Sequence, residues 1–437
     1  MTRATTRAAR GATSLAAAGV AATAVALAAA QTISAGRPRT IPVGTPAPGA
    51  RAARVDAART GRARTELPAS GLRTEWRIPL GMLVDHAPLV DARGGVYVVG
   101  TRGEVIAVAR DGTERWRTST GAAQPGPPAL LSDDTLVFVD AAGQAVGVRG
   151  GAVRWRVRFG RGDAARPAPM PLDDGGVVVA TSRELSALDA DGRERARTVL
   201  PEATTLPLVA ALGKVLVVSA SGAVWSWQPG ADEVLRVASF GSAVEGGAAM
   251  ADDRTLVAVT AGGAHLCAMD LQRGGGAAVE TLAVASGGLW IGPPAVEPAA
   301  THLALWTATG ELAVALDRSG AEVSRSLILA HSQPVSADGG VAPLSPPAHA
   351  APLVDAAGTF AFATPSGGIG VASPARTELL SQERCEPPIG ASAARGGPAV
   401  SGLAPLGDGA VVVACHAGAL LAVRGDPAAQ RGDDADR

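Results

Sequence analysis

The sequence predicts an all-β fold, an eight-bladed β-propeller in which an N-terminal strand closes the last blade. Apolar strands of four residues recur eight times, with starts separated by 40, 41, 38, 41, 47, 57 and 51 residues, and no strong helical period lies between them. A repeat of about forty residues with several short strands is typical of a propeller blade. The eight strands are residues 96–99, 136–139, 177–180, 215–218, 256–259, 303–306, 360–363 and 411–414.

Each copy places the same frame around this strand. The first copy reads PLVDARGGVYVVGTRGEVIAVARDGTERWR from Pro88: an apolar lead-in, a turn, the apolar strand, a strand of small residues, a Gly hairpin and an outer strand. The central strand is apolar throughout, which indicates that neighbouring blades cover both of its faces. The Asp-Gly pair at residues 111–112 predicts a hairpin, because Gly tolerates positive φ. Four strands per copy predict one blade per copy.

Tryptophan follows the hairpin at a fixed distance in the first two copies. Trp116 lies four residues after Gly112, and Trp155 lies four residues after Gly151. We expect each ring to lie on an outer strand and to fill the gap to the neighbouring blade, since an indole buries a large area. The alternative is an exposed aromatic side chain that binds a partner.

The two ends of the repeat region complete one another. The last copy ends without an outer strand, while an orphan strand at residues 72–80 precedes the first copy and carries Trp76. Placing this strand in the last blade gives Trp76 the same blade-docking role and removes two exposed sheet edges. The propeller is therefore predicted to span residues 71–425, and deletion through Pro79 is expected to lower its stability sharply.

The N-terminus predicts export. Residues 1–35 combine a basic start, a charge-free stretch of small apolar residues and a small-residue cleavage site. These are the features of a cleaved signal peptide. The alternative is a retained anchor that would tether the protein to the inner membrane. The expected location is the periplasm or the cell envelope.

Two further segments read as disordered. Residues 36–70 are rich in Arg, Pro and Ala without any period, which is typical of a disordered linker. Deletion through Ala69 is therefore expected to leave stability unchanged. Residues 426–437 are expected to form a disordered tail.

The composition argues against several functions. The net charge is −1 at pH 7, so no nucleic-acid partner is expected. There is no Asn and no adjacent Cys pair, aromatic residues make up 3 %, and the 6 His residues have no zinc-like spacing. Chemistry needs positioned acids, bases or metals. The sequence therefore predicts no catalytic, cofactor-binding or metal-ligating residues and no cofactor.

The cysteines allow one disulfide. Of the 3 cysteines, Cys385 falls in the long connection of the seventh blade and Cys415 ends the central strand of the eighth. Because these blades are neighbours in the ring, Cys385 and Cys415 are the expected pair in an exported protein. The alternative is that these two and Cys267 are all buried or free thiols.

The glycine-to-tryptophan offset, with AVARDG at residues 107–112 and ALDADG at residues 187–192, resembles the pyrroloquinoline-quinone-like (PQQ-like) propeller repeat. The resemblance covers residues 72–423 and is loose in the later copies. It implies blades docked through tryptophans. One branch of the family contains quinone-dependent dehydrogenases, whose Ca²⁺ is held by Glu, Asn and the quinone. The other branch is non-catalytic and is similar to the scaffold lipoprotein of the outer-membrane β-barrel assembly machine.

The absence of Asn favours the non-catalytic branch. We therefore expect an exported protein-interaction scaffold that binds envelope proteins. The alternatives are a small-ligand binder that uses the central channel and a degenerate quinone-dependent dehydrogenase. Long connections at residues 321–351 and 373–400 are expected to form the interaction rim, because loops longer than needed are often functional. Simple disorder is the alternative for these connections.

Overall fold

The computed structural model divides the chain into two compact units, residues 1–40 and 41–437. The structure describes residues 41, 52, 55–56, 58–69, 71–160, 165–260, 265–271, 280–282, 289–297, 299–306, 310–317, 321–330, 350–363, 367–373, 377–380, 385 and 400–425. The predicted signal or anchor at residues 1–35 and the predicted tail at residues 426–437 lie outside them. Within the described part of the chain, no helix has the length and apolar character needed to cross a membrane.

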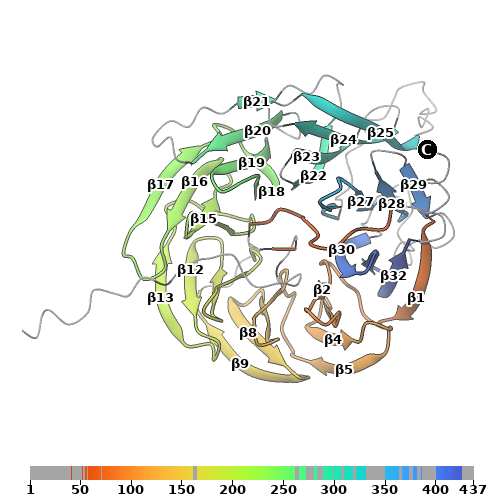
Figure 1. Ribbon diagram of the computed structural model, residues 1–437. Helices are drawn as coiled ribbons and strands as arrows, with labels where there is room; N and C mark the ends of the chain where they lie inside the picture. The colour runs from red at the N-terminus through yellow and green to blue at the C-terminus, as the bar shows by residue number, and fades with distance from the viewer. Residues whose placement is uncertain are drawn as a thin grey trace, which may run out of the picture. The chain divides into compact units, whose positions relative to one another are not determined.

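The second unit is an eight-bladed β-propeller, as predicted (Figure 1). Each blade is a four-stranded antiparallel sheet, and in blades 1 to 7 the strands run in chain order from the axis outward. Blades 1 to 4 are β2 (Leu89–Val90), β3 (Val96–Val99), β4 (Glu104–Val108), β5 (Glu114–Ser119); β6 (Ala129–Leu130), β7 (Leu136–Val139), β8 (Gln144–Arg149), β9 (Ala152–Arg158); β10 (Met170–Pro171), β11 (Val177–Ala180), β12 (Glu184–Leu188), β13 (Glu194–Val199); and β14 (Val209–Ala211), β15 (Lys214–Val218), β16 (Ala223–Trp227), β17 (Val234–Ser239).

The remaining blades follow the same order around the ring. They are β18 (Val244–Met250), β19 (Thr255–Thr260), β20 (His265–Asp270), β21 (Glu280–Leu282); β22 (Leu289–Val296), β23 (Ala300–Trp306), β24 (Gly310–Asp317), β25 (Glu322–Ala330); β26 (Leu353–Val354), β27 (Phe360–Ala363), β28 (Ile369–Ala372), β29 (Thr377–Leu380); and β30 (Val400–Gly407), β31 (Ala410–Cys415), β32 (Ala419–Arg424) with β1 (Arg73–Pro79).

Burial explains the two kinds of strand pattern in the sequence. The second strand of blade 1, β3, is buried at every position, because neighbouring blades cover both of its faces. The outer strand β9 alternates instead between exposed and half-buried residues. Side chains of a strand point alternately to opposite faces, so one face of β9 packs on a blade and the other meets solvent.

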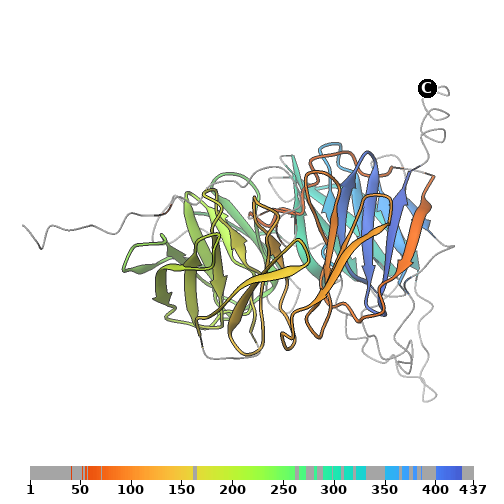
Figure 2. The same ribbon diagram turned by 90° about the horizontal axis from the view of Figure 1, so that it is seen from below.

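The ring closes through β1, as the sequence predicts. Strand β1 pairs antiparallel with β32 from the far end of the chain, with Arg73 opposite Arg424 and Pro79 opposite Ala419. Figure 2 shows the two strands side by side, β1 in orange and β32 in blue. The last blade thus takes its outer strand from the beginning of the propeller, and the outer edge of β32 is covered.

Residues 58–69, which we call the axial strap, are ordered, so the prediction of a disordered linker at residues 36–70 does not hold for this part of it. The strap crosses the middle of the ring (Figure 1). The carbonyl of Ala58 accepts a hydrogen bond from the Met250 amide at 3.0 Å, and the Ala63 amide donates to the Val354 carbonyl at 2.7 Å. These bonds join the strap to the inner strands of blades 5 and 7. The strap lacks an apolar period because backbone groups at the ends of other strands order it, and composition does not reveal such partners.

Candidate functional site

Tryptophans join neighbouring blades at the outside of the ring. Trp76 of β1 packs on the hairpin of blade 1: its indole N–H donates to the Arg110 carbonyl at 2.9 Å, and a Cβ on Gly112 would lie 3.0 Å from the ring. Trp155 of β9 makes the equivalent contact with blade 3, donating to the Ala190 carbonyl at 3.0 Å. The fixed offset in the sequence thus places each indole over the glycine of the next blade's hairpin.

Trp116 makes the same kind of contact between blades 1 and 2. A Cβ on Gly151 would lie 3.4 Å from its side chain. Its ring also lies against Tyr97, with centroids 6.0 Å apart and a tilt of 59°, a favourable arrangement for two aromatic rings. The Trp116 ring is therefore packed within the protein, which leaves little of its surface for a partner.

One disulfide joins blade 8 to the segment that leads into it. Cys385 and Cys415 are bonded, with S–S at 2.03 Å and a sequence separation of 30 residues. This is the pair expected from the sequence. Cys267 is a buried free thiol whose sulfur lies 3.2 Å from the Thr260 hydroxyl.

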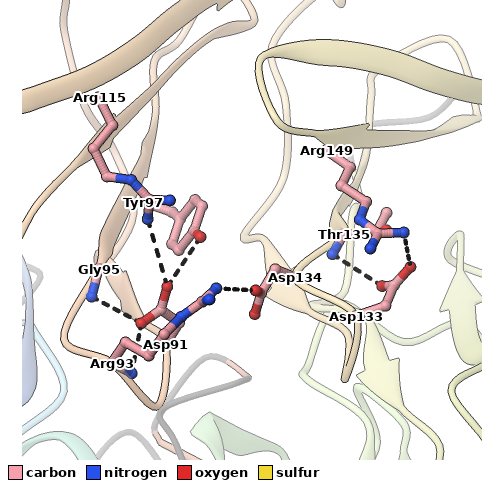
Figure 3. Close-up of polar contacts among 9 residues, drawn as sticks. All are labelled: Asp91, Arg93, Gly95, Tyr97, Arg115, Asp133, Asp134, Thr135 and Arg149. Carbon is pink, nitrogen blue, oxygen red and sulfur yellow. Dashed lines mark hydrogen bonds and ion pairs between the residues drawn. The ribbon is translucent and has the colours of Figure 1, made fainter.

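Asp91 sits in a turn of blade 1 and is fully occupied there (Figure 3). It is 3 % exposed and accepts hydrogen bonds from the Gly95 amide at 2.8 Å and from the Tyr97 hydroxyl at 3.1 Å. Burial, followed by the charge and hydrogen bond of Asp91, raises the pKa of Tyr97 to about 12. A carboxylate with these partners organises its turn and is poorly placed to act as a base.

An ion pair links this turn to the next blade. Arg93 reaches from blade 1 to Asp134 of blade 2 at 2.5 Å (Figure 3). Asp133 holds its own turn by accepting from the Thr135 amide at 3.0 Å, and it pairs with Arg149 at 3.1 Å. Acids on this face of the ring are therefore used to shape turns and to join blades. Within the described ranges, no group of three or more His, Cys, Asp or Glu residues could hold a metal ion.

The axis of the ring is crossed by a buried arginine. Arg59 of the axial strap is 0 % exposed, and its guanidinium donates to the carbonyls of Leu208 at 2.7 Å, Ala168 at 3.1 Å and Pro169 at 3.0 Å. Burial lowers the pKa of Arg59 to about 10, although Asp56 opposes the shift. The inner strands of blades 3 and 4 are thus bridged by the chain itself at the place where a central-channel ligand would enter.

The outer strands of blades 8, 1, 2 and 3 present exposed arginines at alternate positions. We call this set the arginine edge: Arg73, Arg77, Arg115, Arg117, Arg154, Arg156, Arg158, Arg195 and Arg197. Because side chains alternate across a strand, these arginines point away from the face that carries the docking tryptophans. The basic side chains therefore lie on the more exposed face of each outer strand.

Nearby acids neutralise part of the arginine edge. Arg117 pairs with Glu114 at 2.7 Å, and Arg197 pairs with Glu194 at 2.7 Å. Strand β9, AVRWRVR, carries three arginines and no acid. Among the residues that the structure describes, Arg154 and Arg158 have no hydrogen-bond or ion-pair partner, whereas Arg156 donates to the Thr120 carbonyl. The outer strand of blade 2 is therefore the most strongly basic part of the edge.

The expected interaction rim is mostly beyond the described residues. The segment 321–351 begins with β25, the outer strand of blade 6, and the segment 373–400 contains β29, the outer strand of blade 7. These outer strands fall within the segments that the sequence predicts to be long connections. Residues 331–349 and 386–399 lie outside the described part.

Two functional features could not be read fully from the sequence. The arginines of β9 recur at every second position, which places them on one face of a strand. Which of them has a partner depends on the neighbouring blade, because among the described residues Arg156 reaches a carbonyl of blade 1 and Arg154 and Arg158 do not. Arg59 lies in a segment of disordered composition, and its three carbonyl partners come from residues more than 100 positions away. Only the folded ring brings these groups together.

Comparison with a known family supports the propeller type. Residues 68–274 match the family model described as outer membrane protein assembly factor BamB. The crystal structure of BamB from Moraxella catarrhalis is similar, with a TM-score of 0.54 and 16% identity over 82% of this chain and 99% of that chain. A search among curated proteins found no match.

Two other solved structures share the architecture. Quinohemoprotein alcohol dehydrogenase from Comamonas testosteroni gives a TM-score of 0.62 with 12% identity, covering 86% of this chain and 80% of that chain. The C-terminal WD40 domain of Sif2 gives a TM-score of 0.57 with 11% identity, covering 82% of this chain and 99% of that chain. At these identities the likeness concerns the fold alone, since one fold hosts many functions.

Proposed function

We propose that this chain, whose residues 68–274 match the BamB family model, is an exported, non-catalytic scaffold that binds protein partners in the cell envelope. The family description supports a role in the envelope. The axial strap supports a non-catalytic role, because it crosses the channel that a ligand or quinone would need. The turn acids support it further, since their lone pairs are used in hydrogen bonds to neighbouring amides.

The observation that carries the proposal is the outer strand of blade 2. Arg154 and Arg158 are exposed and lack partners within the described residues. A surface with this excess of positive charge attracts an acidic surface and steers its approach. Arginine is also suited to carboxylates, because its planar guanidinium can form paired hydrogen bonds with them. The proposed partner is an envelope protein that presents an acidic segment to this strand.

Capture from the native envelope tests this proposal. Protein carrying both Arg154→Glu and Arg158→Glu should bind its partner about 5- to 30-fold more weakly, since reversal of two contact charges weakens association by roughly 1–2 kcal/mol. Raising the salt concentration should weaken capture by the unmodified protein in the same way. Arg236→Glu is the matched control, because Arg236 is exposed on the outer strand of blade 4.

Two outcomes would contradict this assignment. Equal capture by the double variant and the unmodified protein would show that the arginine edge is not the binding surface. Binding only to vesicles of anionic lipid, with no captured protein, would replace the protein partner by a membrane surface. Melting curves of all three proteins must coincide for either comparison to count.

Export is part of the proposal and has its own test. N-terminal sequencing of protein from the native envelope fraction should find a start between residues 30 and 36. An intact Met1 in the inner membrane would favour the anchor, and an intact Met1 in the cytosol would contradict export.

The second candidate function is that of a quinone enzyme, and the similarity of the fold to an alcohol dehydrogenase favours it. Calorimetric titration with pyrroloquinoline quinone and Ca²⁺ distinguishes it from the scaffold. The scaffold proposal expects no saturable binding. Stoichiometric quinone binding together with dye-linked alcohol oxidation would overturn it.

A further inference from the structure

A cavity of about 440 Å³ lies between blades 6 and 7, on other blades than the arginine edge. Its walls are mostly small or apolar, and its polar groups include Glu297, His302, Ser324 and Ser373. Phe360 of β27 contributes an aromatic wall. The volume lies in the range of small-molecule sites, which combine apolar walls with a few positioned polar groups.

Glu297 and His302 form the polar end of this cavity. Both are nine-tenths buried, with exposures of 7 % and 8 %. Glu297 follows β22 and accepts a hydrogen bond through Oε2 from the Ala299 amide at 3.0 Å. Its Oε1 lies 3.6 Å from His302 Nε2, which is too far for a hydrogen bond. Glu297 Oε1 and His302 Nε2 therefore face one another without forming a hydrogen bond.

The histidine is held in position but is left unsatisfied. Its ring stacks on Phe360, with centroids 5.8 Å apart and an angle of 23° between the planes. Its Nε2 atom is buried and has no hydrogen-bond partner among the described residues. A buried polar atom without a partner destabilises a fold, because it has lost its hydrogen bonds to water. Such atoms are rare in native proteins and are often explained by a bound group.

The charge of the cavity favours a cation. Among the described residues, Glu297 is the only Asp, Glu, Lys or Arg that lines the cavity, and no described Lys or Arg pairs with its carboxylate. Burial lowers the pKa of His302, although Glu297 and then Asp355 oppose the shift. A neutral imidazole can offer a nitrogen lone pair as an acceptor. As far as the structure describes the chain, the cavity then presents two acceptors and one negative charge that no Lys or Arg neutralises.

We propose that this cavity binds an alkylammonium group, with the ammonium donating to Glu297 Oε1 and His302 Nε2 and its alkyl chain packing on Phe360 and the small side chains around it. An ammonium has three donors and no acceptor, so it satisfies both atoms at once. The adjacent aromatic ring also favours a cation. The group can come from a free amine or from a lysine side chain of a partner protein.

Titration of the full-length protein with pentan-1-amine near neutral pH tests the proposal. We expect saturable binding, a change in the His302 ring signals in the NMR spectrum, and at least tenfold weaker binding of pentan-1-ol, which lacks the charge. Glu297→Gln should weaken amine binding at least tenfold. Glu322→Gln is the control, because Glu322 lies on the outer strand of the same blade and pairs with the exposed Arg325.

A second variant keeps the test valid if Glu297→Gln does not fold. Ser324 is exposed on β25 and lines the cavity, so Ser324→Phe should fill the mouth and abolish binding without disturbing the core. Nα-acetyl-lysine amide identifies the source: tighter binding than pentan-1-amine indicates a partner's lysine, and weaker binding indicates a free amine. Failure of both ligands to bind folded protein, or equal binding of the alcohol, would overturn the proposal.

Discussion

At the residue scale, the contact between neighbouring blades depends on an indole ring and on the absence of a Cβ atom. Gly192 adopts φ of 79°, and a Cβ there would lie 2.6 Å from the Trp155 ring. Glycine is needed for two reasons: the backbone conformation is left-handed, and the ring occupies the space of the side chain. Only the first reason can be read from a hairpin motif.

Gly192→Ala separates these two reasons when it is compared with Gly150→Ala. Gly150 also has positive φ, at 58°, but nothing lies within 4 Å of its missing Cβ. We expect Gly192→Ala to lower the free energy of unfolding by about 2–3 kcal/mol and Gly150→Ala by about 1 kcal/mol, the cost of backbone strain alone. Urea unfolding measures both. Equal effects of the two variants would show that the indole contact does not constrain the glycine.

Tyr97 provides an internal probe of the first blade, because it is the 1 tyrosine in the chain. Its pKa is raised to about 12 by burial and by Asp91, against about 10 in an unfolded chain. A raised folded-state pKa adds stability that is fully present below about pH 10 and is lost between about pH 10 and 12. In the folded protein, the absorbance of tyrosinate should therefore rise only at pH values well above 10. A midpoint near 10 in folded protein would contradict the Asp91 hydrogen bond.

At the scale of elements, the sequence predicts the regular strands well and the irregular segments poorly. The central strand recurs in every blade, because each copy meets the same environment between two neighbouring blades. Strands β25 and β29 fall within segments that the sequence predicts to be long connections. The sequence predicts disorder for the axial strap, because the groups that order it lie on inner strands far away in the sequence. The Glu297–His302 site could not be predicted either, because Phe360, which stacks on His302, comes from the next blade.

The disulfide should stabilise the junction between blades 7 and 8. Its loop of 30 residues predicts a contribution of about 3–4 kcal/mol through the entropy of the unfolded chain. Cys385→Ser with Cys415→Ser should lower the free energy of unfolding by about that amount. Cys267→Ala is the control for loss of a cysteine. Peptide mapping without reduction should recover the Cys385–Cys415 pair and a free Cys267, and any other pairing would contradict the structure.

At the scale of the whole propeller, two N-terminal segments hold the ring together in different ways. Strand β1 completes the last blade from the outside, and its Trp76 docks on blade 1. The axial strap joins inner strands from the inside, through Arg59 in blades 3 and 4 and through backbone bonds in blades 5 and 7. A closed ring has no free end blade, so removal of either segment should affect the whole propeller.

Three chains that start at residues 41, 71 and 81 test these contributions in turn. The chain from 71 keeps β1 but loses the strap, including a guanidinium with three carbonyl partners and the buried Leu67. It should melt several degrees below the chain from 41, because burial and satisfied carbonyls are lost. The chain from 81 also loses β1 and should melt lowest of the three.

Light scattering adds a second signature to this series. Without β1, the outer edge of β32 carries unpaired backbone groups that can pair with another chain, so the chain from 81 should self-associate while the chain from 71 stays monodisperse. Arg59→Met in the chain from 41 should reproduce part of the loss caused by removing the strap. Equal melting temperatures for the chains from 41 and 71 would restore the linker prediction. Equal temperatures for the chains from 71 and 81 would refute closure through β1, because the last blade would then be equally stable with three strands or four.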